Sequence, residues 1–366
     1  MFSNIYAGRR ILVTGHTGFK GSWLATWLAH LGAHVAGYSI GIPSQPSNFE
    51  VLRLDRRLHH YAGDVRNRKQ FQDVLNDFRP EMIFHLAAQS LVRRSYDDPA
   101  TTFETNAVGT MNVLESIRLS PDVRAAVIIT SDKCYRNVEW IWGYRENDVL
   151  GGEDPYSASK ACAEMVSYAY IKSYFKANAN TVAVATARAG NVIGGGDWAE
   201  DRIIPDCIRS WSKGEGVRIR NPQSTRPWQH VLEPLSGYLH LGARLWQREK
   251  ENFGGAYNFG PDANVNHPVS TLIQEVGAYW PGAKWVFESP DPQARPEAKL
   301  LKLCCDKALM ELKWRSVLTF SETARLTGEW YNKFYTQSDA DMYVFTLQQI
   351  DTYAKLAQDK EVAWTR

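Results

Sequence analysis

The chain has 366 residues, of which 44% are hydrophobic and 22% are charged, and its 42 Lys and Arg residues nearly balance its 40 Asp and Glu residues. This composition is typical of a globular protein with a large core, and the balanced charge excludes a general attraction to nucleic acid or to a membrane surface. The N-terminus does not have the pattern of a leader peptide, and no run reaches the roughly 20 apolar residues of a membrane span. The five cysteines lack the spacing of a metal site or of a disulfide framework. We therefore expect a cytoplasmic protein without metal or membrane partners.

The N-terminal segment has the pattern of a βαβ unit. RRILVT (9–14) is a β-rich apolar run, and apolar residues at helical spacing follow it as far as Leu31. Gly32 is typical of a helix C-terminus, and HVAGYS (34–39) has the pattern of a second strand.

Later segments continue this alternation. Apolar runs at 82–88, 125–131 and 181–190 alternate with helical stretches around 67–78, 99–119 and 157–176. The pattern predicts an α/β fold of Rossmann type, with a doubly wound parallel sheet and helices on both faces. We expect a Rossmann domain over 5–190, a smaller C-terminal α+β lobe over 191–335 whose elements are partly interleaved with the first, and a C-terminal tail over 336–366.

A glycine-rich turn, TGHTGFKG (14–21), lies between the first strand and the first helix. Glycine permits positive φ and lets backbone N–H groups approach a pyrophosphate at the positive end of a helix. In this context the motif predicts dinucleotide binding, and a simple glycine-rich turn is the alternative. The ending Lys20-Gly21 differs from that of a nucleoside triphosphatase loop. The expected contacts are Gly15, Thr17, Gly18, Phe19, Lys20 and Gly21.

The loop that follows the second strand favours NAD over NADP. It carries no charge between Ser39 and Asn48, so no arginine awaits the 2′-phosphate of NADP. Asp64 and Val65, after the third strand, are candidates for binding the adenine end of the cofactor. The alternative for Asp64 is to cap the helix that begins near Arg66.

Two clusters of polar residues have the pattern of a catalytic site. Tyr156 and Lys160, in YSASK, are four residues apart and share one face of a helix. A neighbouring ammonium would lower the pKa of Tyr156 and make it a proton acceptor. TSDKCY (130–135) places Ser131, Asp132 and Lys133 at the end of a strand, where open parallel sheets present catalytic groups. A strand cap alone would account for Ser131 or Asp132 singly.

Five segments carry a resemblance to a known family: TGHTGFKGSWL, HLAAQSLVRRSY, TSDKCY, GGEDPYSASK and RAGNVIGGGDW. They resemble the extended short-chain dehydrogenases/reductases of NAD-dependent epimerase/dehydratase type, and among these the CDP-glucose 4,6-dehydratase branch. The resemblance runs from about residue 5 to the late 320s. Lys133 replaces the glutamate of the related dTDP-sugar dehydratases, which matches this branch.

The resemblance implies a lyase that converts CDP-glucose to the 4-keto-6-deoxy sugar and water by an internal NAD redox cycle, for deoxysugar and surface polysaccharide (O-antigen) synthesis. Tyr156 would accept the C4 hydroxyl proton, Ser131 would bind O4, and Asp132 would protonate the departing C6 hydroxyl. Lys133 is the first candidate for the C5 base. That role needs a pKa lowered by burial or by Lys160; otherwise Lys133 gives electrostatic support.

The resemblance also implies binding residues in both domains. On the cofactor side these are Leu86, Ala87, Ala88, Gln89 and Asn106, together with Tyr156 and Lys160; an exposed helix amide is the alternative for Asn106. On the nucleotide-sugar side they are Asn191, Asp197, Arg202, Arg220, Arg226 and His230. Arg226 is the strongest single candidate for the diphosphate, whereas surface ion pairs would account for Arg202 and Arg220, and a structural role for His230.

Several alternatives remain open at this point. Another NAD-dependent nucleotide-sugar dehydratase or 4-epimerase would share most of these residues, and a non-catalytic dinucleotide sensor would share the fold. Asp132 and Lys133 argue against an epimerase, and the complete proton-transfer set argues against a sensor. A homodimer or a dimer-based tetramer is expected, with the helices at 99–119 and 157–176 as the candidate interface.

Overall fold

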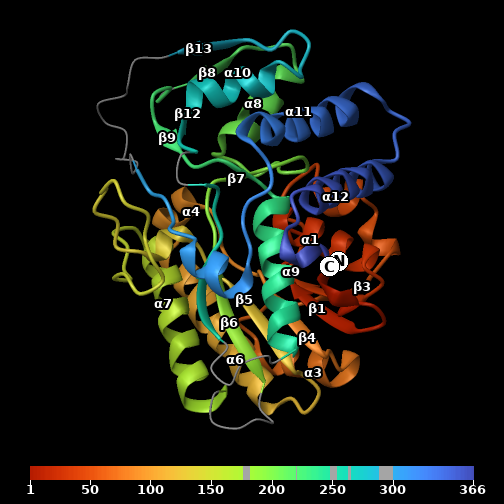
Figure 1. The fold of residues 1–366 in the computed structure, drawn as a ribbon, viewed down its shortest axis with the longest axis vertical. Helices are drawn as coiled ribbons and strands as arrows, with labels where there is room; N and C mark the ends of the chain where they lie inside the picture. Colours follow the sequence, from red (N-terminus) through yellow and green to blue (C-terminus); the bar gives the residue numbers. More distant parts are fainter. Residues whose placement is uncertain (176–181, 220, 248–253, 263–264, 288–299) are drawn as a thin grey trace.

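The computed structural model describes residues 1–175, 182–219, 221–247, 254–262, 265–287 and 300–366. Its centre is a seven-stranded sheet of order β11-β6-β5-β4-β1-β2-β3, with every neighbouring pair parallel (Figure 1). The strands are β1 (Arg10–Thr14), β2 (His34–Ser39), β3 (His59–Ala62), β4 (Met82–His85), β5 (Ala125–Ile129), β6 (Ala183–Arg188) and β11 (Gly255–Asn258). The expected Rossmann-type fold class is therefore confirmed.

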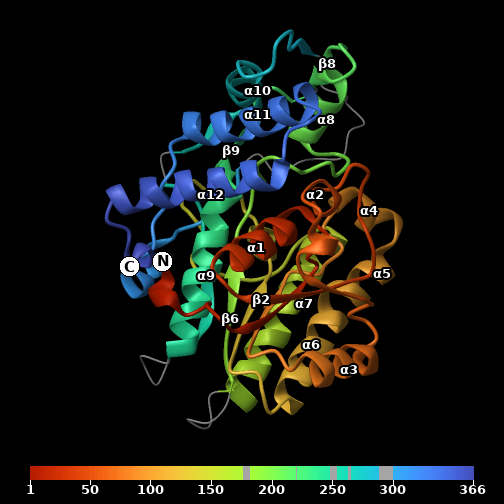
Figure 2. The same ribbon diagram turned by 90° about the vertical axis from the view of Figure 1, so that its right-hand side faces the viewer.

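Helices cover both faces of this sheet (Figure 2). On one side lie α3 (Arg68–Phe78), α4 (Val92–Asp97), α5 (Pro99–Phe103), α6 (Gly109–Leu119) and α7 (Pro155–Tyr170); on the other lie α1 (Phe19–His30) and α9 (Leu232–Gln247). Strand residues alternate between the two cores: Ile11 and Val13 pack with the α1 side, whereas Leu12 packs with the α3 side. This alternation is the two-residue period of a strand buried on both faces.

Two of the expected helices contain a wider turn. The helix expected at 99–119 consists of α5, a π-helical turn at Glu104–Val108 and α6. The helix expected at 157–176 consists of α7 and a π-helical turn at Ile171–Phe175. Such turns are often found at functional sites, and the first of them contains Asn106.

The chain beyond residue 190 builds a smaller lobe above the carboxyl ends of the strands (Figure 1). Its short strands pair as β7 (Val192–Ile193) with β10 (Gln229–His230), β9 (Thr225–Arg226) with β12 (His267–Pro268) and β8 (Val217–Ile219) with β13 (Trp285–Phe287). Its helices are α8 (Ile203–Trp211), α10 (Val269–Gly277) and α11 (Phe320–Thr336). Since α9 and β11 return to the large sheet, we keep the division near residue 190 as a proposal.

The C-terminal segment packs against the first domain. It forms α12 (Met342–Asp359), which contacts α1 and α11. Trp364 is fully buried and stacks on Phe2 with ring centroids 5.1 Å apart. The Tyr353 hydroxyl donates to Glu233 of α9 at 2.9 Å. Residues 336–366, expected only as a tail, thus belong to the core, and the two chain ends lie side by side (Figure 2).

Within the described ranges, none of the helices combines the length and the apolar character that a transmembrane segment requires.

Candidate active site

The turn between β1 and α1 has the geometry that a dinucleotide requires. Gly15 has φ +74°, and a Cβ there would lie 2.8 Å from the backbone nitrogen of Ala87. A Cβ on Gly21 would lie 2.1 Å from the Gly15 carbonyl oxygen. Gly18 is the N-cap of α1, and no side chain caps the helix, which leaves its first-turn N–H groups available to an anion. The turn therefore fits the pyrophosphate of NAD.

The loop after β4 lies against this turn. Ala87 donates its N–H to Thr14 Oγ1 at 3.1 Å, and Thr14 Oγ1 is also 2.7 Å from His85 Nδ1. Thr17 Oγ1 donates to the Gly41 carbonyl at 2.6 Å, which connects the turn to the loop after β2. The partly exposed residues Leu86, Ala87, Ala88 and Gln89 follow β4 directly. These expected cofactor residues therefore share the carboxyl edge of the sheet with the glycine turn.

Asp64 lies at the same edge, after β3, but it does not cap a helix. The N-cap of α3 is Asn67, which accepts the N–H of Gln70. Asp64 instead accepts the N–H of Arg66 at 2.9 Å and pairs with its guanidinium. Burial opposes ionisation of Asp64, but its hydrogen bonds with Arg66 outweigh burial and hold its pKa below the usual value. Val65, the next residue, is buried.

Asn106 is fully buried in the π-helical turn and is not an exposed amide. Its Oδ1 accepts the N–H of Gln89 at 2.9 Å. Its Nδ2 donates to the Gln89 carbonyl and to Ser159 Oγ, both at 2.9 Å. Because Ser159 lies between Tyr156 and Lys160 on α7, Asn106 connects the loop after β4 to the helix that carries this pair.

Tyr156 and Lys160 are both buried on α7, with exposed fractions of 8% and 5%. The helix begins at Pro155, and Asp154 caps it by accepting the N–H of Ser157. Burial raises the pKa of Tyr156 to about 12; a hydrogen bond with Ser131 and the charge of Arg202 act in the opposite direction. The expected lowering of this pKa is therefore wrong for this structure, because desolvation of the phenolate outweighs the nearby positive charge.

Ser131 and Asp132 face this pair from the end of β5. Ser131 caps the short helical turn at Asp132–Cys134 and donates to Asp132 Oδ1 at 3.0 Å. The Asp132 carboxylate lies on the backbone of Gly190, where a Cβ would be 1.9 Å from Oδ2. The absence of a side chain at Gly190 therefore makes room for the acid that the sequence singled out.

Lys133 is exposed, so the burial that a lysine base requires is not present in this structure. Lys20, expected only among the cofactor contacts, lies within the cluster instead. Burial lowers the pKa of Lys20 to about 8; the positive charge of Arg202 lowers it further, and Asp132 opposes the shift. Lys20 is thus a second lysine near Asp132 with a lowered pKa.

Asp197 and Arg202 join this cluster from the small lobe. Asp197 is buried and pairs with Arg202 at 2.8 Å. The second Arg202 nitrogen, Nη2, donates to Ser90 Oγ, 3.5 Å away, in the loop after β4. Arg202 also acts on the pKa of Tyr156, so this arginine connects Asp197 to the loop after β4 and is more than a surface ion-pair partner.

The other expected substrate residues lie in different surroundings. Asn191 has φ +53° and accepts the N–H of Gln229, which joins β7 to β10. Arg226 donates to the Thr225 carbonyl at 2.8 Å on β9. His230 is fully buried, meets Trp23 edge to face, and has a pKa that burial lowers to about 3. This burial agrees with a structural role for His230, which was the alternative to substrate binding. Arg220 lies outside the described residues.

Three buried residues near the site were not expected. Tyr238 of α9 is fully buried, its hydroxyl has no hydrogen-bond partner among the described residues, and burial with the nearby Asp132 and Tyr156 raises its pKa. Glu164 and Arg188 form a buried ion pair at 2.8 Å. Glu164 could have been found by extending the four-residue spacing of the Tyr156–Lys160 pair, whereas Tyr238 has no local signal.

Comparisons with known proteins agree with this geometry. A family model described as GDP-mannose 4,6 dehydratase matches residues 12–327. The CDP-glucose 4,6-dehydratase of Salmonella typhimurium is 45% identical to the chain, over 96% of this chain and 97% of the relative. Two solved structures share the fold. UDP-glucose-4-epimerase of Stenotrophomonas maltophila, with bound NAD, has a TM-score of 0.77 at 20% identity and covers 89% of this chain and 98% of its own. dTDP-glucose 4,6-dehydratase of Bacillus anthracis, in complex with NAD, has a TM-score of 0.73 at 20% identity. The match covers 93% of this chain and 100% of that chain.

Proposed function

The chain belongs to the GDP-mannose 4,6 dehydratase family, and we propose that it converts CDP-glucose to CDP-4-keto-6-deoxyglucose and water. It is an NAD-dependent nucleotide-sugar 4,6-dehydratase. The observation that carries the choice of substrate is the 45% identity to a CDP-glucose 4,6-dehydratase over almost the full length of both chains. The Asp132-Lys133 pair at the end of β5, beside Tyr156, supports a dehydratase over an epimerase.

The fit of the site to NAD rests on the glycine turn and the uncapped α1. When bound there, NAD supplies a hydride acceptor that removes hydride from sugar C4 and returns it at C6. The Gly15–Gly21 turn would hold the pyrophosphate, and Asp64 with Val65 would contact the adenine end. Asn106 would support the cofactor through the loop after β4, with which it shares two hydrogen bonds, and Lys160 would contact the cofactor from α7.

The proton transfers fall to the side chains around Asp132. Tyr156 would accept the C4 hydroxyl proton, assisted by the Arg202 charge and the Ser131 hydrogen bond, both of which favour the phenolate. Asp132, buried against Gly190, would protonate the departing C6 hydroxyl. Lys133 remains our candidate for the C5 base on the condition that the bound sugar covers it, because an exposed ammonium cannot accept a proton.

The nucleotide diphosphate would bind on the small-lobe side of the cleft. Arg202 is already held by Asp197 and reaches across to Ser90, so its guanidinium is oriented for a phosphate without a further ordering step. We propose Arg202 as the first diphosphate contact and Arg226 as the second.

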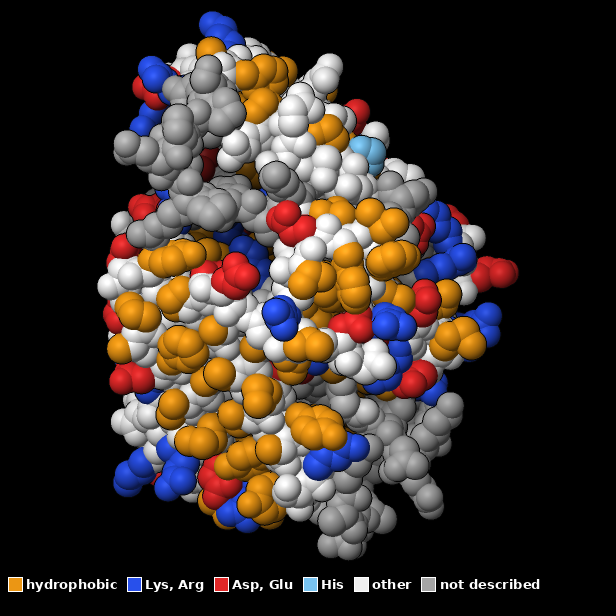
Figure 3. Space-filling view, turned by 90° about the vertical axis from the view of Figure 1, so that its left-hand side faces the viewer, with side chains coloured by type: hydrophobic (Ala, Val, Ile, Leu, Met, Phe, Trp, Pro, Cys, Tyr) orange, Lys and Arg blue, Asp and Glu red, His pale blue; other side chains and the backbone are white. Residues whose placement is uncertain are grey.

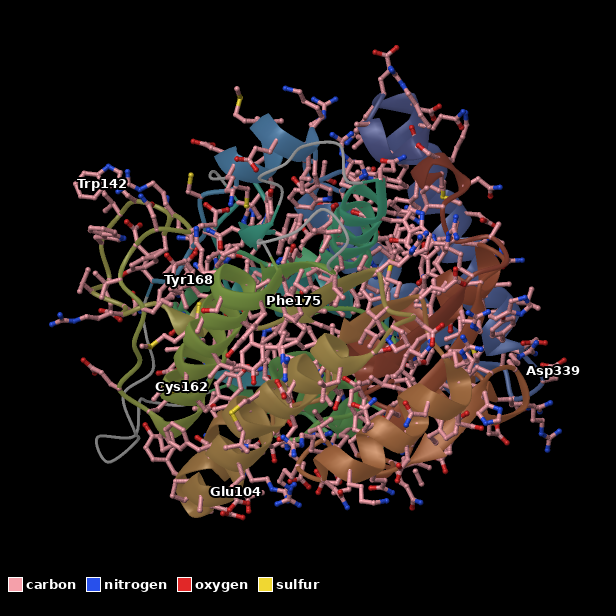
Figure 4. The ribbon with its side chains drawn as sticks, turned by 90° about the horizontal axis from the view of Figure 1, so that it is seen from below. Glu104, Trp142, Cys162, Tyr168, Phe175 and Asp339 are labelled. Atoms are coloured by element: carbon pink, nitrogen blue, oxygen red, sulfur yellow. The ribbon has the colours of Figure 1, made fainter. Side chains whose placement is uncertain are left out.

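We also propose a homodimer through α6 and α7. Hydrophobic side chains gather on this outer face (Figure 3), and Cys162 and Tyr168 lie along α7 on the outer side of the molecule (Figure 4). The exposed apolar residues of the two helices and their π turns are Val108, Met111, Leu119, Met165, Tyr168 and Tyr174. A contiguous apolar face of this kind indicates a protein interface.

We further propose a cytoplasmic enzyme that supplies a deoxysugar for surface polysaccharide. Its five cysteines are all free thiols, which suits a reducing compartment. NAD and nucleotide sugars are also metabolites of the cell interior.

Incubation with CDP-, dTDP-, UDP- and GDP-glucose and substoichiometric NAD tests the function. Loss of one water from CDP-glucose, followed by mass, without net NADH, is the expected result. Isomer formation without a mass change would establish an epimerase, dehydration of another nucleotide sugar would change the substrate, and no turnover of any of them would revive the dinucleotide sensor.

A further inference from the structure

A buried carboxylate lies one helical turn behind the catalytic lysine. Lys160 and Glu164 are four residues apart on α7 and therefore share one face of the helix. Their exposed fractions are 5% and 3%. We propose that Glu164 is a positioning residue of the active site, whose carboxylate keeps the Lys160 side chain charged beside Tyr156; this inference rests on the proposed dehydratase function.

The Glu164 carboxylate is held from two strands of the sheet. Thr130, at the end of β5, donates its hydroxyl to one carboxylate oxygen. Thr186 and Arg188, on β6, donate to the other oxygen at 2.9 and 2.8 Å. Because three donors from two strands converge on it, the carboxylate keeps a single orientation relative to the strand end that carries Asp132.

Arg188, which pairs with Glu164 at 2.8 Å, is itself held in place by further hydrogen bonds. Its second guanidinium nitrogen donates to the Tyr135 hydroxyl at 2.6 Å and to the Glu146 carbonyl at 3.1 Å. The Tyr135 hydroxyl in turn donates to Asn258 Oδ1 at 2.8 Å. Glu164 is therefore the end of a buried polar chain that reaches the active-site helix.

Among the groups whose charges act on the pKa of Lys160, Glu164 is the carboxylate, and it also pairs with Arg188. Burial lowers the pKa of Lys160 to about 8, and Glu164 is the first group that opposes the shift. Cys134, from the turn after β5, is a neutral thiol at ordinary pH because burial raises its pKa. His85 of β4, whose pKa burial lowers to about 3, is neutral as well. Lys20 of α1 repels the ammonium.

A purely structural role is the competing explanation. A buried ion pair is a weak source of stability, because the cost of desolvation offsets most of the attraction. A helix that needed only to be anchored to β6 would be held as well by apolar packing. What an apolar residue could not supply is a negative charge one helical turn from the buried Lys160 ammonium.

The test compares Glu164→Gln, which keeps the side-chain shape and removes the charge, with Thr186→Val, which removes one hydrogen bond and keeps the charge. Competitive acetylation of lysines, read at Lys160 by peptide mass spectrometry from about pH 6 to about pH 10, reports the midpoint at which the amine becomes reactive. The second measurement is the alkaline limb of kcat/KM with CDP-glucose.

In Glu164→Gln both midpoints are expected to fall by about one pH unit, as befits loss of a nearby opposite charge, while Thr186→Val keeps the parental midpoints. A folded Glu164→Gln with reduced thermal stability and parental midpoints would overturn the proposal. If that variant does not fold, Glu164→Asp, which withdraws the charge by one methylene, must still lower the labelling midpoint. Labelling needs no substrate, so a parent enzyme inactive on CDP-glucose would refute the proposed function and leave this test intact.

Discussion

Replacement of Gly190 by alanine is the perturbation whose effect follows most directly from the structure. The new methyl group would lie 1.9 Å from Asp132 Oδ2 and 2.1 Å from the carboxyl carbon. Real Cβ atoms essentially never lie under 3.0 Å from another heavy atom, so the carboxylate has to move away by about 1 Å. Gly190 itself needs no positive φ, which means that the backbone at the end of β6 tolerates alanine.

A displacement of about 1 Å at a reacting group costs roughly 100-fold in rate, or about 2.7 kcal/mol in the activation free energy. We therefore expect Gly190→Ala to lower kcat for dehydration of CDP-glucose about 100-fold. The affinity for NAD, measured by calorimetry, should stay within about twofold, because Gly190 is not one of the residues expected to contact the cofactor. The assay is loss of water from CDP-glucose, with circular dichroism to verify the fold.

The matched control is Gly216→Ala. A Cβ there would meet only the side chain and backbone of Lys284, at 3.7 Å or more, in ordinary van der Waals contact. This variant should keep the parental kcat. A folded Gly190→Ala enzyme with kcat within about threefold of the parent would show that Asp132 is not the acid that protonates the leaving hydroxyl.

Three further predictions concern the cofactor turn, the pH dependence of stability and the C-terminal segment. Gly15→Ala combines a φ of +74° with a contact of 2.8 Å to the Ala87 backbone, and should weaken NAD binding at least about tenfold in calorimetry; unchanged affinity would refute the assignment of the turn. Burial raises the pKa of Glu233 from 4.5 to about 7, so the folded state binds this proton more tightly than the unfolded chain. Binding of this proton therefore contributes on the order of 3 kcal/mol to the free energy of unfolding. The contribution is complete below about pH 4.5 and is lost as the pH rises to about 7. Urea unfolding of Glu233→Gln should lack that part of the pH dependence, and identical pH curves for parent and variant would contradict it. Trp364→Ala removes a fully buried indole and should lower the free energy of unfolding by about 3 to 5 kcal/mol; a loss below about 1 kcal/mol would mean that the C-terminal segment does not belong to the core.

The parts of this protein that the sequence predicted correctly depend on residues close together in the chain. The apolar runs at 9–14, 34–39 and 125–131 have the composition and length of buried strands, and β1, β2 and β5 lie within them. The glycine turn is defined by three positions within one strand–turn–helix junction. The Tyr156–Lys160 pair follows from helical spacing alone, because positions four apart share a face in any α-helix.

What the sequence could not predict depends on burial and on contacts between distant segments. Residue 255 begins the edge strand β11, and the C-terminal α12 covers α1, although more than 300 residues separate them. His230 is fully buried and Lys133 is exposed, and the local sequence does not indicate either.

The pKa values in the site also depend on burial and on contacts between distant segments. The pKa of Tyr156 is raised, because desolvation in the assembled cleft outweighs the charges that the local motif supplies. The Asp132 carboxylate fits where it does because Gly190, 58 positions along the chain and after a neighbouring strand, has no side chain. Local sequence determines the secondary structure and which chemical groups are present, but only tertiary packing decides which of them lose water and which of them meet.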